Sequence, residues 1–244
     1  MAVVRITRPI LDIVFAQEQA TDMPMTRVTR VYAYIDGWNF YCAINEPRRL
    51  RYGWCNFVKL ADALALRLFA EKTRLVKYFN TPVEQKKDQI NEGELERSRM
   101  WFRALEIETG LKPIRGRFKK DETSITKRRE KEADVHLAVD MLSDAPNYDA
   151  ALLVSADTDF RPLIRKLAGE RGKTVVVCYV EARQARPETD LLVPNWRTEP
   201  IPDSLLEGCR LANQVRDPST GETILWDHYI AMKGRNFPPS NRMG

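Results

Sequence analysis

Residues 150–179 read AALLVSADTDFRPLIRKLAGERGKTVVVCY, and this stretch decides the fold. Two short and continuously apolar runs, at 150–154 and 174–179, flank a longer segment at 160–171 whose apolar residues recur at helical spacing. Strands that are apolar throughout are buried on both faces, as in a parallel sheet between two layers of helices. The stretch therefore predicts a strand–helix–strand unit of an α/β domain.

The same alternation of short apolar runs and longer helical patterns extends over most of the chain. Further strands are expected at 31–35, 73–79, 113–118 and, as an edge, 196–199; helices are expected at 57–70, 91–109, 131–143 and, more weakly, 203–211. The expected fold is an α/β, three-layer αβα sandwich with a mostly parallel central sheet, over residues 29–200. Residues 1–28 are expected to form an N-terminal extension, and residues 201–244 a C-terminal helix and tail.

The composition is that of an ordinary globular protein. The chain has 244 residues, of which 43% are hydrophobic and 30% charged. It has no apolar run of the roughly 18 residues that a membrane span needs. The N-terminal stretch lacks a small-residue cleavage site, and the four cysteines are scattered without a CxxC pair. These features argue against secretion, a disulfide framework and a structural zinc site, and they favour the cytoplasm.

Positive charge is concentrated in one stretch. Residues 111–131 contain nine basic and three acidic residues, a balance of +6 in a chain whose net charge is +5. A basic segment on an almost neutral body predicts one polyanion-binding face, although a solvated run of charge explains the count equally well. The candidate nucleic-acid-binding residues are Arg115, Arg117, Lys119, Lys120, Lys127, Arg128, Arg129 and Lys131.

Acidic residues follow two of the predicted strands. The first strand leads directly into Asp36, and the strand AALLV is soon followed by Asp157 and Asp159. A fourth acid, Asp134, lies early on the apolar helix that precedes AALLV. Because functional groups gather at the carboxyl ends of parallel strands, these four carboxylates are expected to converge at one edge of the sheet. Asp140 lies well round the helix from Asp134, so it is expected to be a supporting or surface acid.

Converging carboxylates repel one another unless a cation lies among them. Mg²⁺ and Mn²⁺ prefer carboxylate oxygens and water, and such an ion beside a basic surface is the arrangement that phosphodiester hydrolysis requires. Each acid also has a structural explanation: Asp36 in an Asp-Gly turn, Asp159 as a helix N-cap and Asp157 as a solvated loop acid. Taken together, the four acids favour the functional interpretation.

Three stretches resemble the NYN domain family, in the LabA-like branch of the PIN-like nucleases. They are YIDGWNFY at 34–41, KEADVHLAVDML at 131–142 and LLVSADTDFRPLIRKLAGERGKTVVV at 152–177. In the family pattern, an apolar strand runs into Asp-Gly-x-Asn, Lys-x-x-Asp-Val lies on a helix, and another strand runs into Ser-Gly-Asp-Ser-Asp-Phe. The three stretches have the same order here, and the chief departure is Ala156 in place of the glycine of the last motif.

The resemblance implies a metal-dependent ribonuclease, with an endonuclease expected, that acts on single-stranded or structured RNA; DNA is a possible substrate too. A metal-bound water would attack the phosphate, and no side chain is expected to act as a covalent nucleophile. The residues carried over are Asp36, Asp134, Asp157 and Asp159 as the acidic cluster that binds Mg²⁺ or Mn²⁺, with Asn39, Ser155 and Thr158 in support.

Two other classes of function remain open. A nucleic-acid-binding or regulatory protein could use the same fold with little turnover, although clustered negative charge does not favour phosphate binding. A phosphotransferase or glycosyltransferase could hold a metal through Asp157 and Asp159 alone. The sequence leaves the oligomeric state open. Aromatic residues that follow the first acid could stack on bases or pack in the core; they are Trp38, Phe40, Tyr41, Tyr52 and Trp54.

Overall fold

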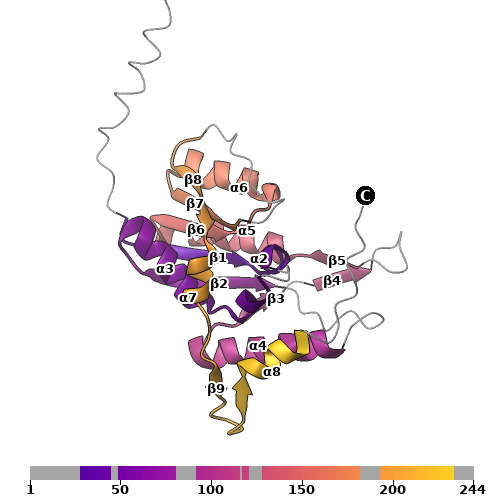
Figure 1. Cartoon of the computed structure of the whole chain (residues 1–244). Coiled ribbons are helices and arrows are strands. Elements are labelled where there is room, and N and C mark those ends of the chain that lie inside the picture. Colours follow the sequence, from indigo (N-terminus) through magenta and orange to yellow (C-terminus); the bar gives the residue numbers. More distant parts are fainter. Residues whose placement is uncertain are drawn as a thin grey trace, which may run out of the picture.

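The computed structural model describes residues 28–44, 49–80, 92–115, 117–120, 128–181 and 193–233, so the expected extension lies outside it up to residue 27. The main sheet has the strand order β3-β2-β1-β6-β7-β8, and every neighbouring pair is parallel. The bounds are β1 Val31–Asp36, β2 Thr73–Asn80, β3 Pro113–Arg115, β6 Ala150–Val154, β7 Thr174–Val180 and β8 Trp196–Ile201. Helices cover both faces of this sheet (Figure 1), which confirms the predicted sandwich.

Alternate residues of β1 belong to two separate hydrophobic cores. Val31 and Ile35 lie in the larger core, and Tyr34 lies in the smaller one on the other face. The larger core is covered by α2 (Gly37–Ile44), α3 (Phe57–Phe69), α4 (Glu92–Thr109) and the C-terminal elements, and the smaller core by α5 (Ala133–Asp144) and the helical segment after β6. Because both faces are covered, every residue of β6 is buried, as its apolar sequence predicts.

Two helical regions differ from the expectation. Periodicity does not predict α2, because eight residues make barely two turns and the helix begins with glycine. The segment expected as one helix at 160–171 consists of a 3₁₀ turn, η5 (Thr158–Phe160), a short α6 (Arg161–Ile164) and a π-helical stretch, η6 (Arg165–Glu170). None of the described helices is long and apolar enough to cross a lipid bilayer.

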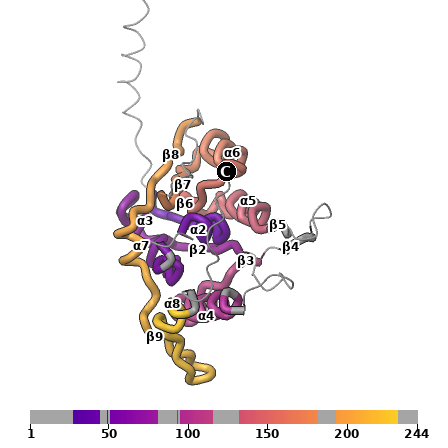
Figure 2. The backbone as a smooth tube through the Cα atoms, turned by 45° about the vertical axis from the view of Figure 1, so that its right-hand side comes forward, coloured from indigo at the N-terminus to yellow at the C-terminus, as the bar shows by residue number. Residues whose placement is uncertain are grey.

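The strand expected at 113–118 is divided in two. β3 ends at Arg115, and the chain from Arg117 forms β4 (Arg117–Lys120). β4 pairs antiparallel with β5 (Arg128–Lys131) in a separate two-stranded sheet. This β4–β5 hairpin projects from the side of the body in both views (Figure 1 and Figure 2).

The C-terminal segment packs on the larger core. It contains α7 (Asp203–Gly208), the small hairpin of β9 (Gln214–Arg216) and β10 (Thr223–Leu225), and α8 (Trp226–Lys233). Leu206, Leu211 and Tyr229 are buried there. α8 lies alongside α4 in both views (Figure 1 and Figure 2), so the last described helix closes one end of the fold.

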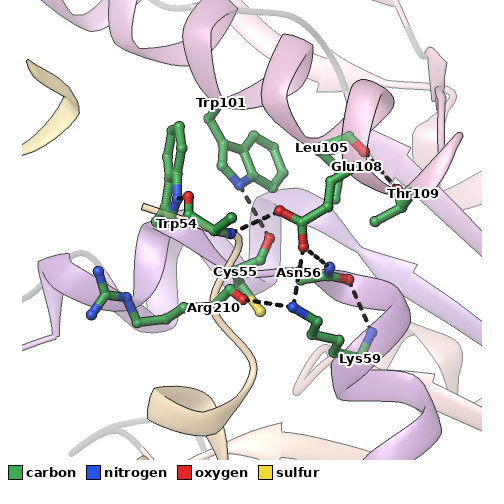
Figure 3. Close-up of polar contacts among 10 residues, drawn as sticks. Trp54, Cys55, Asn56, Lys59, Trp101, Leu105, Glu108, Thr109 and Arg210 are labelled. Atoms are coloured by element: carbon green, nitrogen blue, oxygen red, sulfur yellow. Dashed lines mark hydrogen bonds and ion pairs between the residues drawn. The ribbon is translucent and has the colours of Figure 1, made fainter. Parts of the chain in front are cut away.

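Hydrogen bonds fasten this segment to the 3₁₀ turn at Leu50–Trp54, to the start of α3 and to α4 (Figure 3). The Trp54 indole Nε1 donates to the Ala212 carbonyl at 3.0 Å, and the Ala212 backbone N donates to Glu108 Oε2 at 2.7 Å. Glu108 Oε1 accepts from Asn56 Nδ2 at 2.8 Å and from Lys59 Nζ at 3.1 Å. Burial opposes a charged Glu108, yet these donors bring the pKa of its carboxyl below the ordinary value.

Candidate functional site

Asp36 lies where β1 ends and α2 begins, and only 6% of it is exposed. Its Oδ1 accepts a hydrogen bond from the backbone N of Asn39 at 3.0 Å, which caps the first turn of α2. Its Oδ2 accepts from the Ser155 hydroxyl at 2.9 Å. Both carboxylate oxygens therefore have a donor within the protein, as a buried acid requires.

The turn that follows β6 is fastened to this acid. Ser155 Oγ, which donates to Asp36, accepts from the backbone N of Asp157 at 3.1 Å. Asn39 Oδ1 accepts from the backbone N of Ala156 at 2.8 Å. One hydroxyl and one amide thus join the ends of β1 and β6, which are neighbours in the sheet. These bonds hold Asp36 and the Asp157 backbone at the same edge.

Asp157 caps the helical turn after β6. Its Oδ1 accepts from the backbone N of Asp159 at 2.8 Å, and η5 begins at Thr158. The alternative explanation of Asp159 as the N-cap is therefore wrong, because the acid two residues earlier makes the cap. Asp159 takes part in this cap only through its backbone N. Thr158 and Asp159 are both exposed to solvent.

The glycine after Asp36 provides space and does not form a turn. Gly37 is the first residue of α2, and its φ lies outside the left-handed region, so the Asp-Gly turn is not found. A Cβ at this position would lie 2.5 Å from Tyr78 Cε2. Ala156, the departure from the family pattern, also lies outside the left-handed region, so its methyl group does not strain the turn.

Asp134 approaches the acids after β6 from helix α5. It lies in the first turn of α5, on the side that carries the buried Leu137 and Met141. Although much of the residue is exposed, partial burial of the carboxyl raises the pKa of Asp134 above its ordinary value, and the negative charges of Asp157 and Asp159 raise it further. Asp134 therefore lies within electrostatic range of Asp157 and of Asp159. Asp36, Asp134, Asp157 and Asp159 together form the acidic edge of the sheet.

The donor chemistry of the acidic edge fits a hard divalent cation. Carboxylate oxygens are ligands that Mg²⁺ and Mn²⁺ prefer, and repulsion between acids is the interaction that a cation relieves. Within the described part of the chain, no three His, Cys, Asp or Glu side chains are gathered closely enough to hold one ion. Mg²⁺ is commonly bound through one or two carboxylates and keeps several waters, so a site with few direct ligands is compatible with it.

Asp140 is engaged elsewhere. The Lys77 Nζ lies 2.8 Å from Asp140 Oδ2 and 2.7 Å from Asp144 Oδ2. Asp144 also accepts a hydrogen bond from the Tyr34 hydroxyl at 2.9 Å. These contacts join α5 to β2 and β1, so the Asp140 carboxylate takes part in holding the helix on the sheet.

Most of the expected nucleic-acid-binding residues lie on the β4–β5 hairpin. Arg115 is exposed at the end of β3, and Lys127 lies outside the described residues. The register of the hairpin pairs Arg117 with Lys131, Lys119 with Arg129 and Lys120 with Arg128. Six of the eight basic residues expected to bind nucleic acid thus belong to one two-stranded sheet.

An aromatic cavity lies beside Asp36, and no sequence pattern predicts it. Its volume is about 260 Å³, and α2, α4 and α8 with the end of β2 supply its walls. Of the aromatic residues expected near Asp36, Phe40, Tyr52 and Trp54 are buried, whereas Trp38 is 43% exposed at this cavity. The lining aromatic residues from other elements are Tyr78, Trp101, Phe102 and Tyr229. They come from distant parts of the chain, so only the folded structure brings them together.

Comparison with known proteins finds a match to one family model and a similar solved structure. A family model described as the NYN domain matches residues 30–191. No curated protein matches the chain. Among solved structures, a protein of unknown function from Vibrio parahaemolyticus is 17% identical, with a TM-score of 0.47 over 74% of this chain and 98% of that chain.

Proposed function

The chain belongs to the NYN domain family, whose members are generally nucleases, and from this premise we propose that it is a divalent-metal-dependent ribonuclease. The proposed reaction is hydrolysis of internal phosphodiester bonds in single-stranded or structured RNA. The observation that most supports it is the bridge of Ser155 between Asp36 and the Asp157 backbone. That bridge keeps the acids that follow β1 and β6 together at one edge of the sheet. At the same edge, the negative charges of Asp157 and Asp159 raise the pKa of Asp134.

Each part of the site has a proposed task. Asp36, Asp134, Asp157 and Asp159 would surround Mg²⁺ or Mn²⁺, with one or two of them as direct ligands and the others acting through metal-bound water. When bound, such an ion lowers the pKa of a water and neutralises the charge that develops on the phosphate. Asn39 and Ser155 keep Asp36 and the turn after β6 in position through their hydrogen bonds. Basic residues of the β4–β5 hairpin would bind the phosphate backbone of the RNA.

An RNA-binding protein without turnover is the second candidate, and one observation favours it. The described residues include no ready-made group of three side chains that could hold a metal ion. Binding alone would need only the basic hairpin and the aromatic cavity. However, clustered carboxylates weaken phosphate binding unless a cation accompanies them, and this is why hydrolysis is the first choice.

The test is cleavage of a 5′-labelled, mixed-sequence, single-stranded RNA by the full chain at neutral pH. Reactions with Mn²⁺, with Mg²⁺ and with EDTA are compared for the wild type and for Asp134→Asn and Asp157→Asn. We expect internal cleavage that EDTA abolishes. Each substitution removes one negative charge from the acidic edge, so each should reduce cleavage by about 100-fold or more.

Asp203→Asn is the matched control, because Asp203 is exposed on α7 and the exchange removes the same charge outside the acidic edge. Wild-type cleavage by this control, together with loss in the other two variants, would support the proposal. If all the proteins bind the RNA and none cuts it with either metal, the ribonuclease proposal fails and the RNA-binding protein becomes the better reading.

A further inference from the structure

The aromatic cavity beside Asp36 has no task in the chemistry proposed above. Its volume of about 260 Å³ lies just below the range of roughly 300–1,000 Å³ that is usual for pockets holding drug-sized ligands. It therefore fits one flat ring system better than a larger molecule. α8 lies alongside α4 (Figure 2), and α2 with the end of β2 completes the walls.

The sheet register places this cavity next to the acidic edge. Gly37, which directly follows Asp36, lines the cavity. Asn80 lines it too, and it is the residue after Phe79, which pairs with Asp36 across β1 and β2. Asn80 in turn pairs with the exposed Arg115 of β3. Because neighbouring strands lie about 4.8 Å apart, the acidic edge, the cavity and Arg115 follow one another across the sheet.

The walls present flat rings that neighbouring rings hold in place. Phe57, Tyr78 and Trp101 pack against one another, with centroid separations of 4.8, 5.4 and 5.7 Å. At the solvent side, Trp38 stacks on Tyr41 with centroids 5.9 Å apart and planes inclined by 28°. An exposed tryptophan that is supported by a second ring is well suited to stack on an aromatic ligand.

Polar groups lie among these rings. Asn80, Arg97 and Ser98 line the cavity, and Arg97 is only 8% exposed. Amide, guanidinium and hydroxyl groups are the groups that hydrogen-bond to the edges of a nucleobase. A nucleobase has both a flat face and polar edges, so it matches rings and polar groups together better than a purely apolar side chain from a protein partner does. The cavity chemistry and its place between the acidic edge and Arg115 therefore favour a base over a protein side chain.

We propose that the cavity receives one unstacked base of the RNA, beside the phosphodiester whose hydrolysis is proposed at the acidic edge. The inference rests on the proposed ribonuclease function and narrows its substrate to RNA with an unpaired base. Trp38 stacks on this base, and Asn80, Arg97 and Ser98 contact its edge. A base within a duplex must first leave its stack and its pair, so single-stranded and looped RNA are preferred.

The test is RNA binding by the full chain in EDTA, measured by fluorescence anisotropy. Two short oligonucleotides of equal length and charge are compared: one is fully abasic, and the other carries a single base. Because one base is enough to fill the cavity, it should raise the affinity of the wild type about tenfold. Ser98→Phe places a ring inside the cavity, and Trp38→Ala removes the stacking surface, so in both variants the single base should add little.

Ser143→Phe is the matched control, since it makes the same exchange at an exposed position of α5 outside the cavity. It should keep the tenfold gain. A single base that adds nothing to the wild type, or a gain that survives in both Ser98→Phe and Trp38→Ala, would overturn the inference. If metal-dependent cleavage persists without that gain, only the base site is lost; if the gain is present without cleavage, the base site stands and the ribonuclease function fails.

Discussion

The Tyr78 ring occupies the space that a side chain at position 37 would need. Gly37 begins α2 directly after Asp36, so this contact joins the acidic edge to the wall of the aromatic cavity. Tyr78 is 2% exposed and packs against Phe57 and Trp101, which leaves its ring little room to withdraw. The glycine of the Asp-Gly pair is therefore required by packing.

Gly37→Ala is expected to lower the free energy of unfolding by about 1–3 kcal/mol, because the new methyl group overpacks against Tyr78. Urea unfolding followed by circular dichroism measures this change. Gly208→Ala is the control: a Cβ there meets nothing within 4 Å, so the exchange should be neutral or slightly stabilising. Equal losses in the two variants would show that the Tyr78 contact is not responsible.

The sequence alone predicts the positions of some residues of the site but not the hydrogen bonds between them. Asp36 and Asp157 follow apolar strands, and this local pattern is enough to predict their place at the carboxyl edge. The bond from Ser155 to Asp36 spans 119 residues and depends on the pairing of β1 with β6, so no local pattern contains it. The alternative of Asp159 as an N-cap is wrong, and the sequence could not exclude it because either acid of Asp-Thr-Asp suits that position.

Among the elements, the β4–β5 hairpin forms a two-stranded sheet separate from the main sheet. A two-stranded ribbon alone is marginally stable in water. The sequences of β4 and β5, RFKK and RREK, contain six basic residues and one acidic residue. A segment with this charge is expected to bind a polyanion such as the backbone of RNA.

Replacing Arg128 and Arg129 by alanine should weaken RNA binding and flatten its dependence on salt. Each lost phosphate contact is expected to reduce the slope of log K against log salt by about 0.7 for single-stranded RNA. Filter binding at several salt concentrations measures the slope. Lys72, directly before β2, and Arg74, on β2, are both exposed and give a control double variant with the same loss of charge. A slope unchanged in the hairpin variant would exclude this hairpin as the backbone-binding surface.

The long amphipathic helices and the buried strands follow from periodicity, and the shorter elements do not. α3 and α4 run close to their expected bounds because many residues repeat one apolar face. α2 depends on its cap by Asp36 and on burial of Phe40 and Ile44, which are tertiary effects. β9 and β10 have three residues each, too few to show a period.

The whole molecule relies on carboxylates that are charged in the folded state. Hydrogen bonds from the Arg30 side chain and from Thr29 hold the pKa of Asp149 well below its ordinary value. Hydrogen bonds from Ser219 lower the pKa of Asp217 to about 2, with a further contribution from Arg103. A group with a depressed folded pKa stabilises the fold above its unfolded pKa, and this stability is lost as the pH falls through the folded pKa. Acid should therefore destabilise the protein.

Asp149→Asn should lower the free energy of unfolding at neutral pH by about 1–3 kcal/mol, because the asparagine loses the charge that accepts from Arg30. The difference from the wild type should shrink as the pH falls below about 4, where the unfolded wild type binds the proton that its folded state resists. Urea unfolding across the acid range measures both effects. A difference that stays constant down to about pH 2 would contradict a charge-dependent role for Asp149.

The family match ends at residue 191, whereas Tyr229, which closes the aromatic cavity, belongs to α8. The acidic edge and one wall of the base site are thus encoded by separate stretches of the gene. Substitutions in α8 can reshape the cavity while Asp36 and Asp157 stay as they are. If the two proposals hold, the preference for a particular base could change during evolution while hydrolysis at the acidic edge is retained. Protein engineering could likewise alter the base site and keep the hydrolytic site.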